Sequence, residues 1–597
     1  MTKELIHATM ATTAETFAAR TDRVQPRGHE ESAALNRAAR LESLLGDPHD
    51  PANPHGLKAL FAADDRRETP AETEQLLAEA GLGAEFVPAE YGGRLTRADL
   101  LAKVLRPVFR RDVALGFGSG ITSLFATSAV WAAGTERQRR DTARLLTEDG
   151  RASILHHELA HANAILRDEF TARPAPGGGR LLSGRKDVII NAARADAFVV
   201  YARTDAARTP RSHSVLLLDP DQLGAGVRHL PRIETTGMRG CQFSGLEFTD
   251  CAVPEDTLVG RPGEGVALAL RTYQVNRCLI AGTVVAAADT VLHSAVRAVT
   301  AGRSRPVARR WQAPLTGVFA DLLACDSMAT VALRALSLLP DRTHVLAAAV
   351  KYVVPDLLRE NLEELASVLG SRGYERGGSE YGALDKLVRD LPVAGLGHAG
   401  TAACQAVIVP QLRSLAERSW FAEEEPPPEL FRSGAELPAL DYRLLSIAGG
   451  GDFLAASLLG SAARLANVRG VGGQMTALAD LAEAFVTELR ALREACRNLP
   501  AITPGSLADP AVCVLSDRYA LVLAAAAVLG VWEGQDGSDP FLAAPAWAVL
   551  ALSRIGGRLG IPVPDLPEGC VEMVLEELVS RFRAGRSCDL DATAPAQ

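Results

Sequence analysis

The chain has 597 residues, enough for more than one domain with a sizeable core. Its net charge of -9 comes with no sustained basic run, which argues against nucleic acid as the main partner. Nine cysteines without CxxC pairs favour a reducing compartment. The first twenty residues lack the apolar core of a secretion signal, and the longest apolar run, 520–532, is too short to span a bilayer. We therefore expect a cytoplasmic protein that has no membrane partner.

The first part of the chain is predicted to be helical after a polar arm. Residues 1–38 are polar and aperiodic, which predicts a mobile N-terminal arm. Residues 39–150 contain short helical patterns separated by Gly and Pro, which predicts an N-terminal helical domain. Two helices are expected over 98–132, interrupted by the glycines at 116–120.

Residues 151–264 change to the period of β-strands. The segments LLSGRKDVII, DAFVVYARTD and SHSVLLLDP alternate or run apolar over strand lengths and are rich in Val, Ile and Tyr. Near the end of this region FSGLEF predicts another strand. A second apolar step follows it and ends at Pro254, because proline has no amide for the sheet. This region is predicted to be a middle β domain.

The remainder of the chain is predicted to be helical. Residues 265–422 read as a helical bundle with breaks near 302–306, Pro340 and 370–378. The segment EEEPPPEL at 423–430 is a linker, and 423–597 form a helical extension. The predicted fold class is α+β, with helical, β and helical domains in that order and the extension after them.

Several motifs in this order resemble the acyl-CoA dehydrogenase family. Residues 237–282 give a GMRG turn, a strand ending in Val-Pro and a Gly-rich turn that leads into a long helix, as in the hinge of that family. LGDP, VPAEYGG and Arg110–Asp112 (RRD) resemble the N-terminal domain of its larger bacterial members. The resemblance covers about residues 40–420. It implies bound FAD, an acyl thioester substrate carried by coenzyme A or an acyl carrier protein, and a homo-oligomer, most simply a dimer.

The resemblance also implies a carboxylate base that removes the proton α to the thioester carbonyl. In the family it stands before a Gly-Thr pair, or before an arginine in the helix after the β domain. Here Ala399 precedes Gly400-Thr401, and Asn276 precedes Arg277, so neither usual carboxylate is present. His398 is the titratable residue of the first segment, and we predict it as the base. The alternative is a loop histidine without a role. Arg277 is predicted to bind substrate.

The flavin contacts implied by the resemblance are also altered. A segment that opens the β domain places His157 and Asn163 where the family has Thr and Ser, and the strand KDVIIN keeps Asn191 but lacks a tryptophan. Arg303 stands where the family has an arginine near the FAD diphosphate, and LGSRGY matches its Gly-rich turn. Weak FAD binding is expected. The predicted cofactor-binding residues are His157, Asn163, Asn191, Arg303, Gly370, Gly373 and Thr401.

Two other interpretations remain open. In HELAH, His157 and His161 are four residues apart with Glu158 beside them, as in zinc hydrolases. No third ligand can be named, and the segment lies at the entry to a β domain, so no metal is predicted. The other alternative is a family member that has lost the flavin reaction and performs cofactor-independent chemistry or serves as a non-catalytic subunit.

Overall fold

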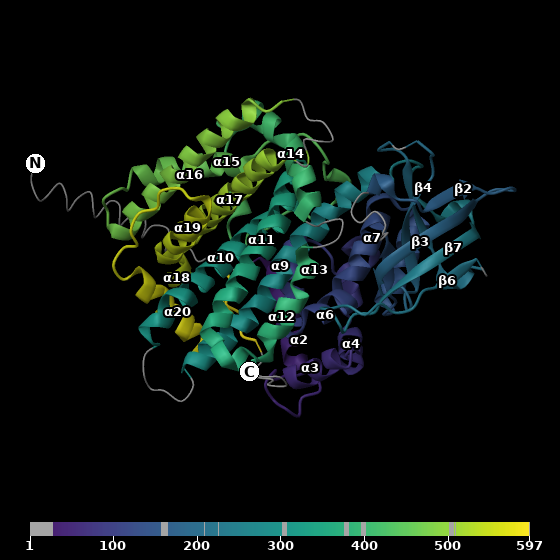
Figure 1. The fold of residues 1–597 in the computed structure, drawn as a ribbon, viewed down its shortest axis with the longest axis horizontal. Coiled ribbons are helices and arrows are strands. Elements are labelled where there is room, and N and C mark those ends of the chain that lie inside the picture. Colours follow the sequence, from purple (N-terminus) through teal and green to yellow (C-terminus); the bar gives the residue numbers. More distant parts are fainter. Residues whose placement is uncertain are drawn as a thin grey trace, which may run out of the picture.

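The computed structural model describes residues 28–156, 165–207, 209–224, 226–300, 307–374, 381–395, 401–500, 507 and 509–595. Helices come first, a β-sheet follows, and helices complete the chain. Figure 1 shows the sheet at one end of the molecule and the C-terminal helices at the other, with the long helices of the bundle between them. The predicted α+β class and the order of its parts are confirmed.

The N-terminal arm is shorter than predicted, because the first described helix begins at His29, nine residues before the expected end of the arm. In α2, Ala34, Ala38, Leu41 and Leu45 recur at helical spacing and are buried. This face packs against α5. The helices of the N-terminal part are α2 (His29–Leu45), α3 (Leu57–Asp65), α4 (Ala71–Glu79), α5 (Ala98–Arg111), α6 (Val113–Leu115), α7 (Thr122–Ala133) and α8 (Glu136–Thr147).

The predicted interruption at residues 116–120 was wrong in position. The chain stays helical there through a π-helical turn, Gly116–Ile121, that leads directly into α7. The break comes earlier, at Asp112, whose extended backbone ends α5 and whose carboxylate accepts a hydrogen bond from the amide of Leu115 (3.1 Å). A capping carboxylate therefore divides the two helices, and the glycines do not.

Within the described residues, eight strands form one mixed sheet in the order β6-β7-β3-β2-β4-β5-β8, and β1 pairs in parallel with β4. The two apolar steps predicted before Pro254 belong to one strand, β7, which pairs with β3 in antiparallel fashion. The strands are β1 (Ala152–Leu155), β2 (Thr171–Pro174), β3 (Arg180–Ile190), β4 (Ala197–Arg203), β5 (His213–Leu218), β6 (Val227–His229), β7 (Phe243–Val253) and β8 (Leu258–Val259).

The C-terminal bundle is built on three long helices that pack against one another. Their ends match the predicted breaks near 302–306 and Pro340, and a 3₁₀ turn, Gly370–Tyr374, follows the third helix. The bundle consists of α9 (Gly265–Thr300), α10 (Arg309–Leu338), α11 (His344–Leu369), α12 (Gly382–Asp390), α13 (Pro392–Gly395) and α14 (Thr401–Arg418).

The helical extension packs on the bundle of its own chain, on the side away from the sheet (Figure 1). The fully buried carboxylate of Asp321 in α10 accepts hydrogen bonds from Arg554 (2.9 Å) and Arg558 (2.7 Å) of α19. These buried pairs fix the extension to the bundle. Its helices are α15 (Phe453–Ala466), α16 (Gly473–Arg497), α17 (Pro510–Glu533), α18 (Pro540–Ala543), α19 (Ala546–Leu559) and α20 (Cys570–Arg583).

Four described helical stretches are long and apolar enough to cross a membrane by length and composition. They are 113–133, α9, α10 and α17, and 67–94% of their most apolar windows is buried inside the protein. The run at 520–532, judged too short from the sequence, is part of the 24-residue helix α17. Packing within the helical layers accounts for most of this apolar surface.

Candidate functional site

The candidate site lies where the first turns of α9 meet the sheet. Tyr273 of α9 forms a hydrogen bond between its hydroxyl and Nδ1 of His156, which directly follows β1 (2.6 Å). The ring of Tyr273 also lies 6.4 Å from that of Tyr201 in β4. Arg277 follows Tyr273 by four residues, so it lies on the same face of the helix. The helix thereby brings Arg277 to the junction between the sheet and the bundle.

Arg277 and Asn276 are buried at this junction with polar atoms that have no partner. Arg277 is 2% exposed and Asn276 is 4% exposed. The Nε of Arg277 and the Oδ1 of Asn276 have no hydrogen bond in the described structure. Buried polar groups are nearly always paired, so unpaired atoms at one place mark a site that receives a ligand or water.

Helix α11 adds two titratable side chains whose pKa values are lowered by the charge of Arg277. His344 and Lys351 are seven residues apart, which places them on one face of the helix two turns apart. Burial, then Arg277, lowers the pKa of His344 to about 4. Burial lowers the pKa of Lys351 to about 7, and Arg277 also lowers it, against an opposing influence of Cys404 in α14. We call Asn276, Arg277, His344, Lys351 and Cys404 the cationic cluster.

Other buried cations of this chain have acidic partners, and the cationic cluster differs from them. The ammonium of Lys386 contacts Asp390 (2.5 Å) and Asp112 (3.2 Å), and these carboxylates raise its pKa against the effect of burial. Lys103 and Arg106 are likewise paired with aspartates. Within the described residues no carboxylate contacts Arg277 or Lys351. The cluster is therefore a buried region of positive charge that the described protein does not neutralise.

Asn191 ties the sheet to the N-terminal helices. It is fully buried at the end of β3, and its amide donates to the carbonyl of Gly118 (2.7 Å) while its Oδ1 accepts from Arg194 (2.8 Å). Both ends of the side chain are thus engaged with protein groups. Its predicted contact with a flavin stays a prediction.

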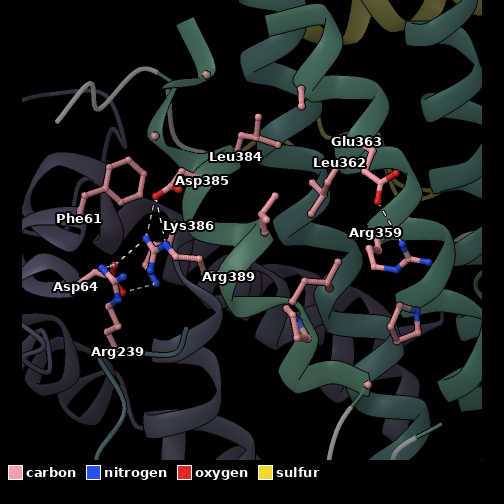
Figure 2. Close-up of a pocket in the computed structure, with 18 of the residues that line it drawn as sticks. Phe61, Asp64, Arg239, Arg359, Leu362, Glu363, Leu384, Asp385, Lys386 and Arg389 are labelled. Carbon is pink, nitrogen blue, oxygen red and sulfur yellow. Dashed lines mark hydrogen bonds and ion pairs between the residues drawn. The ribbon is translucent and has the colours of Figure 1, made fainter. Parts of the chain in front are cut away.

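Gly370 and Gly373 line a cavity of about 790 Å³ between α11, α12 and α3, within the usual size range of ligand sites. Figure 2 shows its charged wall, where Arg389 and Lys386 point toward Asp64 (3.0 and 3.4 Å), while Arg359 and Glu363 pair on the facing helix. Gly370 has φ +55°, and a Cβ built there meets nothing within 4 Å. The backbone at Gly370 is therefore open to solvent or a ligand, and the contact of this turn with FAD stays a prediction.

Several predicted site residues lie outside the described residues. These are His157, Asn163, Arg303 and His398, together with His161 and Glu158 of the alternative zinc motif. Thr401 is the first residue of α14, but its side chain is also outside the description. The roles given to them from the sequence stay predictions. Of the predicted residues, Arg277 is the one that the described structure places in the cationic cluster.

A second polar group, away from the cationic cluster, joins the C-terminal tail to α9. Asp289, His293 and Cys588 each offer a ligand atom within 4.8 Å of the others. The amide of Cys588 donates to Asp289 (3.0 Å), and its sulfur lies 3.4 Å from Nε2 of His293. These contacts dock the tail on the bundle. Arg110 also lies 3.5 Å from Asp289, and its positive charge opposes a bound cation.

The sequence interpretation missed Lys351. It stands in residues 345–355, VLAAAVKYVVP, which contain no other charged residue. A single lysine within an apolar helical run must be buried or reach the surface along its stem, and this pattern was the available signal. Its nearness to Arg277 depends on the packing of α11 against α9, which no local pattern records.

The comparisons with known proteins show which proteins this chain resembles. Residues 161–251 match the family model "Acyl-CoA dehydrogenase, middle domain". The probable acyl-CoA dehydrogenase FadE25 of Mycobacterium tuberculosis is 25% identical over 271 residues, which cover 45% of this chain and 66% of that protein. This chain thus aligns with just under two thirds of that relative's length.

Solved structures support the same fold. An acyl-CoA dehydrogenase complexed with FAD from Bacillus anthracis has a TM-score of 0.64 at 17% identity and covers 93% of this chain and 96% of its own. The prolyl acyl carrier protein oxidase AnaB has a TM-score of 0.55 at 18% identity, covering 63% of this chain and 98% of its own. The first likeness includes the helical extension, because it spans nearly the whole chain.

Proposed function

We propose, from the premise that the chain belongs to the acyl-CoA dehydrogenase family, that it is an FAD-dependent oxidoreductase that removes two hydrogens from the acyl group of a thioester. The observation that carries this proposal is the cationic cluster at the junction of the sheet and the bundle. In that place unpaired polar groups can contact the reacting part of a substrate, as catalysis by charge stabilisation requires. The thioester is carried by coenzyme A or by an acyl carrier protein.

FAD, when bound, supplies the acceptor for the hydride that leaves the β carbon. Gly370 and Gly373 are the described residues that would hold its nucleotide part, because the cavity beside them is large and open. The protein contributes binding and electrostatics at the acyl group. Arg277 binds the acyl part of the substrate and holds it beside the proton acceptor, since a buried cation acts strongly on a nearby polar or anionic group.

The proton acceptor is proposed to be His398. It precedes Ala399 in the segment where the family resemblance expects the base, and a neutral imidazole can take a proton near pH 7. After that transfer the imidazolium adds positive charge beside the developing enolate. Asn276 cannot serve, because an amide does not accept a proton under these conditions.

We also propose a homo-oligomer, most simply a dimer, located in the cytoplasm. The resemblance supports assembly through the bundle, and the unpaired cysteines suit a reducing compartment. Light scattering at micromolar concentration should give a mass at least twice that of the chain, and a monomer would contradict this part of the proposal.

The main test is incubation of the FAD-loaded protein with a series of acyl-CoA thioesters and an artificial electron acceptor. Mass spectrometry should find a product lighter by two hydrogens for at least one thioester. A protein that binds FAD and thioester but forms no such product would favour the alternative in which the family reaction has been lost. No binding of FAD at all would contradict the cofactor assignment.

A further inference from the structure

The cationic cluster holds a permanent charge that the described protein leaves uncompensated. This charge is the guanidinium of Arg277. It is 2% exposed, and its Nε has no hydrogen bond. An unpaired buried charge is strongly destabilising, as is the loss of one partner from a buried ion pair. A stable fold that keeps such a group is explained most simply by a negatively charged ligand that pairs with it.

Among the residues that the structure describes, the neighbouring groups add positive charge and supply no carboxylate. Lys351 is the second cation, at 2% exposure. Burial raises the pKa of the Cys404 thiol, so it stays neutral, and His344 is neutral because its pKa is lowered. Asn276 is an amide. The segment between α13 and α14, residues 396–400, reads Leu-Gly-His-Ala-Gly and contains no carboxylate in its sequence.

The place of the cluster indicates which part of a substrate reaches it. Asn276 occupies one of the two positions where the family resemblance expects the base, and Cys404 follows the other, Gly400-Thr401, by one turn of α14. A base must lie beside the α carbon of the acyl group. Any anionic group of the substrate that meets Arg277 and Lys351 is therefore close to the thioester and remote from the phosphates of the carrier.

We propose that the cationic cluster binds an ionised carboxylate on the acyl group of the substrate, so that the preferred substrate is a short dicarboxylic acyl thioester. This rests on the proposed function, since it names the substrate class of the same site. The planar guanidinium of Arg277 matches a carboxylate geometrically, and the ammonium of Lys351 adds a compact charge. A carboxylate side chain at position 276 would compete for the same cations, and Asn276 leaves them to the substrate.

Binding of such a substrate should be linked to the protonation of Lys351. Burial holds the pKa of this lysine near 7 while no anion is present, and a bound carboxylate favours its charged form. Above pH 7 the complex therefore takes up a proton as it forms. The affinity for the dicarboxylic thioester should fall as the pH rises from 7 to 9, whereas that for a neutral thioester should change little.

The test is calorimetric titration of the full-length, FAD-loaded protein with two matched pairs of thioesters at pH 7. Succinyl-CoA and butyryl-CoA differ by a carboxylate in place of a methyl group, and so do glutaryl-CoA and pentanoyl-CoA. The dicarboxylic member of at least one pair should bind about a hundredfold more tightly, as expected for a buried charge pair. Lys351→Met should reduce this ratio to about tenfold or less, because one of the two cations is lost.

Lys58→Met is the matched control, because Lys58 is exposed in α3, and it should leave the ratio unchanged. Equal affinity within both pairs in the wild-type protein would overturn the proposal, as would an unchanged ratio in Lys351→Met. If Lys351→Met does not fold, the pH dependence of the wild-type ratio decides instead, and a ratio that stays constant from pH 7 to 9 would overturn it.

Free succinate distinguishes a substrate site from a general anion site. It should not displace succinyl-CoA at equal concentration, and displacement would contradict the assignment to an acyl thioester. The readout also separates this inference from the proposed function. If the protein binds the dicarboxylic thioester more tightly but forms no unsaturated product, the proposed reaction alone is refuted. If it forms the product but binds both members of each pair equally, the proposed substrate class alone is refuted.

Discussion

Lys351 and Lys386 are buried to a similar extent in neighbouring helices of the bundle, yet their pKa values move in opposite directions. Three aspartates surround Lys386 and raise its pKa, whereas burial lowers the pKa of Lys351 and the charge of Arg277 lowers it further. Lys386 thus belongs to a network of paired charges, whereas Lys351 belongs to the cationic cluster, whose charge the described residues do not neutralise. This contrast separates a structural lysine from one available to a ligand.

Lys351→Met should raise the thermal stability of the substrate-free protein. The folded state holds the pKa of Lys351 near 7, below its ordinary value of 10.5. Between these values the unfolded chain binds more protons than the folded one, so the wild-type stability rises with pH across this window and is lowest at pH 7 and below. The melting temperature of the variant should exceed that of the wild type, with the largest difference near pH 7.

The measurement is thermal unfolding at pH 7, 8 and 9, with Lys58→Met as control. A variant less stable than the wild type at pH 7 would mean that Lys351 has a stabilising partner in the folded protein.

Asp321→Ala should weaken the docking of the helical extension. It leaves Arg554 and Arg558 without their buried carboxylate, and removal of one partner from a buried pair costs about 3 kcal/mol or more. Limited proteolysis should then cleave within 423–597 faster than in the wild type. Glu417→Gln, which removes an exposed pair with Arg413, is the control and should change little. Equal cleavage of the two variants would contradict this account of the extension.

Arg303→Ala should weaken FAD binding. The family resemblance places this arginine near the cofactor diphosphate, and loss of a charged hydrogen bond lowers affinity by about tenfold or more. Fluorescence titration with FAD measures the effect. Arg137→Ala, in which an exposed arginine of α8 is removed, provides the comparison. Identical affinities in the two variants would remove Arg303 from the cofactor site.

His398→Ala should lower turnover by about a hundredfold or more, the usual weight of a positioned base. Ala399→Glu introduces a carboxylate directly before Gly400-Thr401, where the family resemblance expects the base, and should restore activity in the presence of His398→Ala. The comparison is of turnover of the same thioester by the two single variants and the double variant. Unchanged turnover in His398→Ala would assign the proton transfer to another group.

Much of the fold followed from sequence periodicity, because each strand and long helix carries its own pattern. The apolar steps of 243–253 and the breaks around 302–306 and Pro340 are local signals, and the structure has them where they were expected. The error at 116–120 had a physical cause. Glycines can remain within a buried helical segment, whereas the extended backbone at Asp112 ended the preceding helix and its side chain capped the next one, which its sequence position did not reveal.

The candidate site was harder to predict than the fold. Arg277 was recognised from the motif around it, but Lys351 and His344 lie about seventy residues further along the chain and meet it through helix packing. Whether a buried cation has a partner depends on every element around it. Sequence patterns show which residues of one helix are buried. They therefore predict the helices that form the cationic cluster, but they do not show that its positive charges lack acidic partners.

The measurement that tests the central claim most directly is the absorption spectrum of the FAD-loaded protein during anaerobic titration with a short dicarboxylic acyl-CoA. If the cationic cluster holds the acyl group at the flavin, the oxidised flavin bands should decline as the thioester is added. The decline should be much smaller in Lys351→Met and unchanged in Lys58→Met. A spectrum that no thioester alters in the wild-type protein, or that responds equally in both variants, would contradict the assignment of this cluster as the active site.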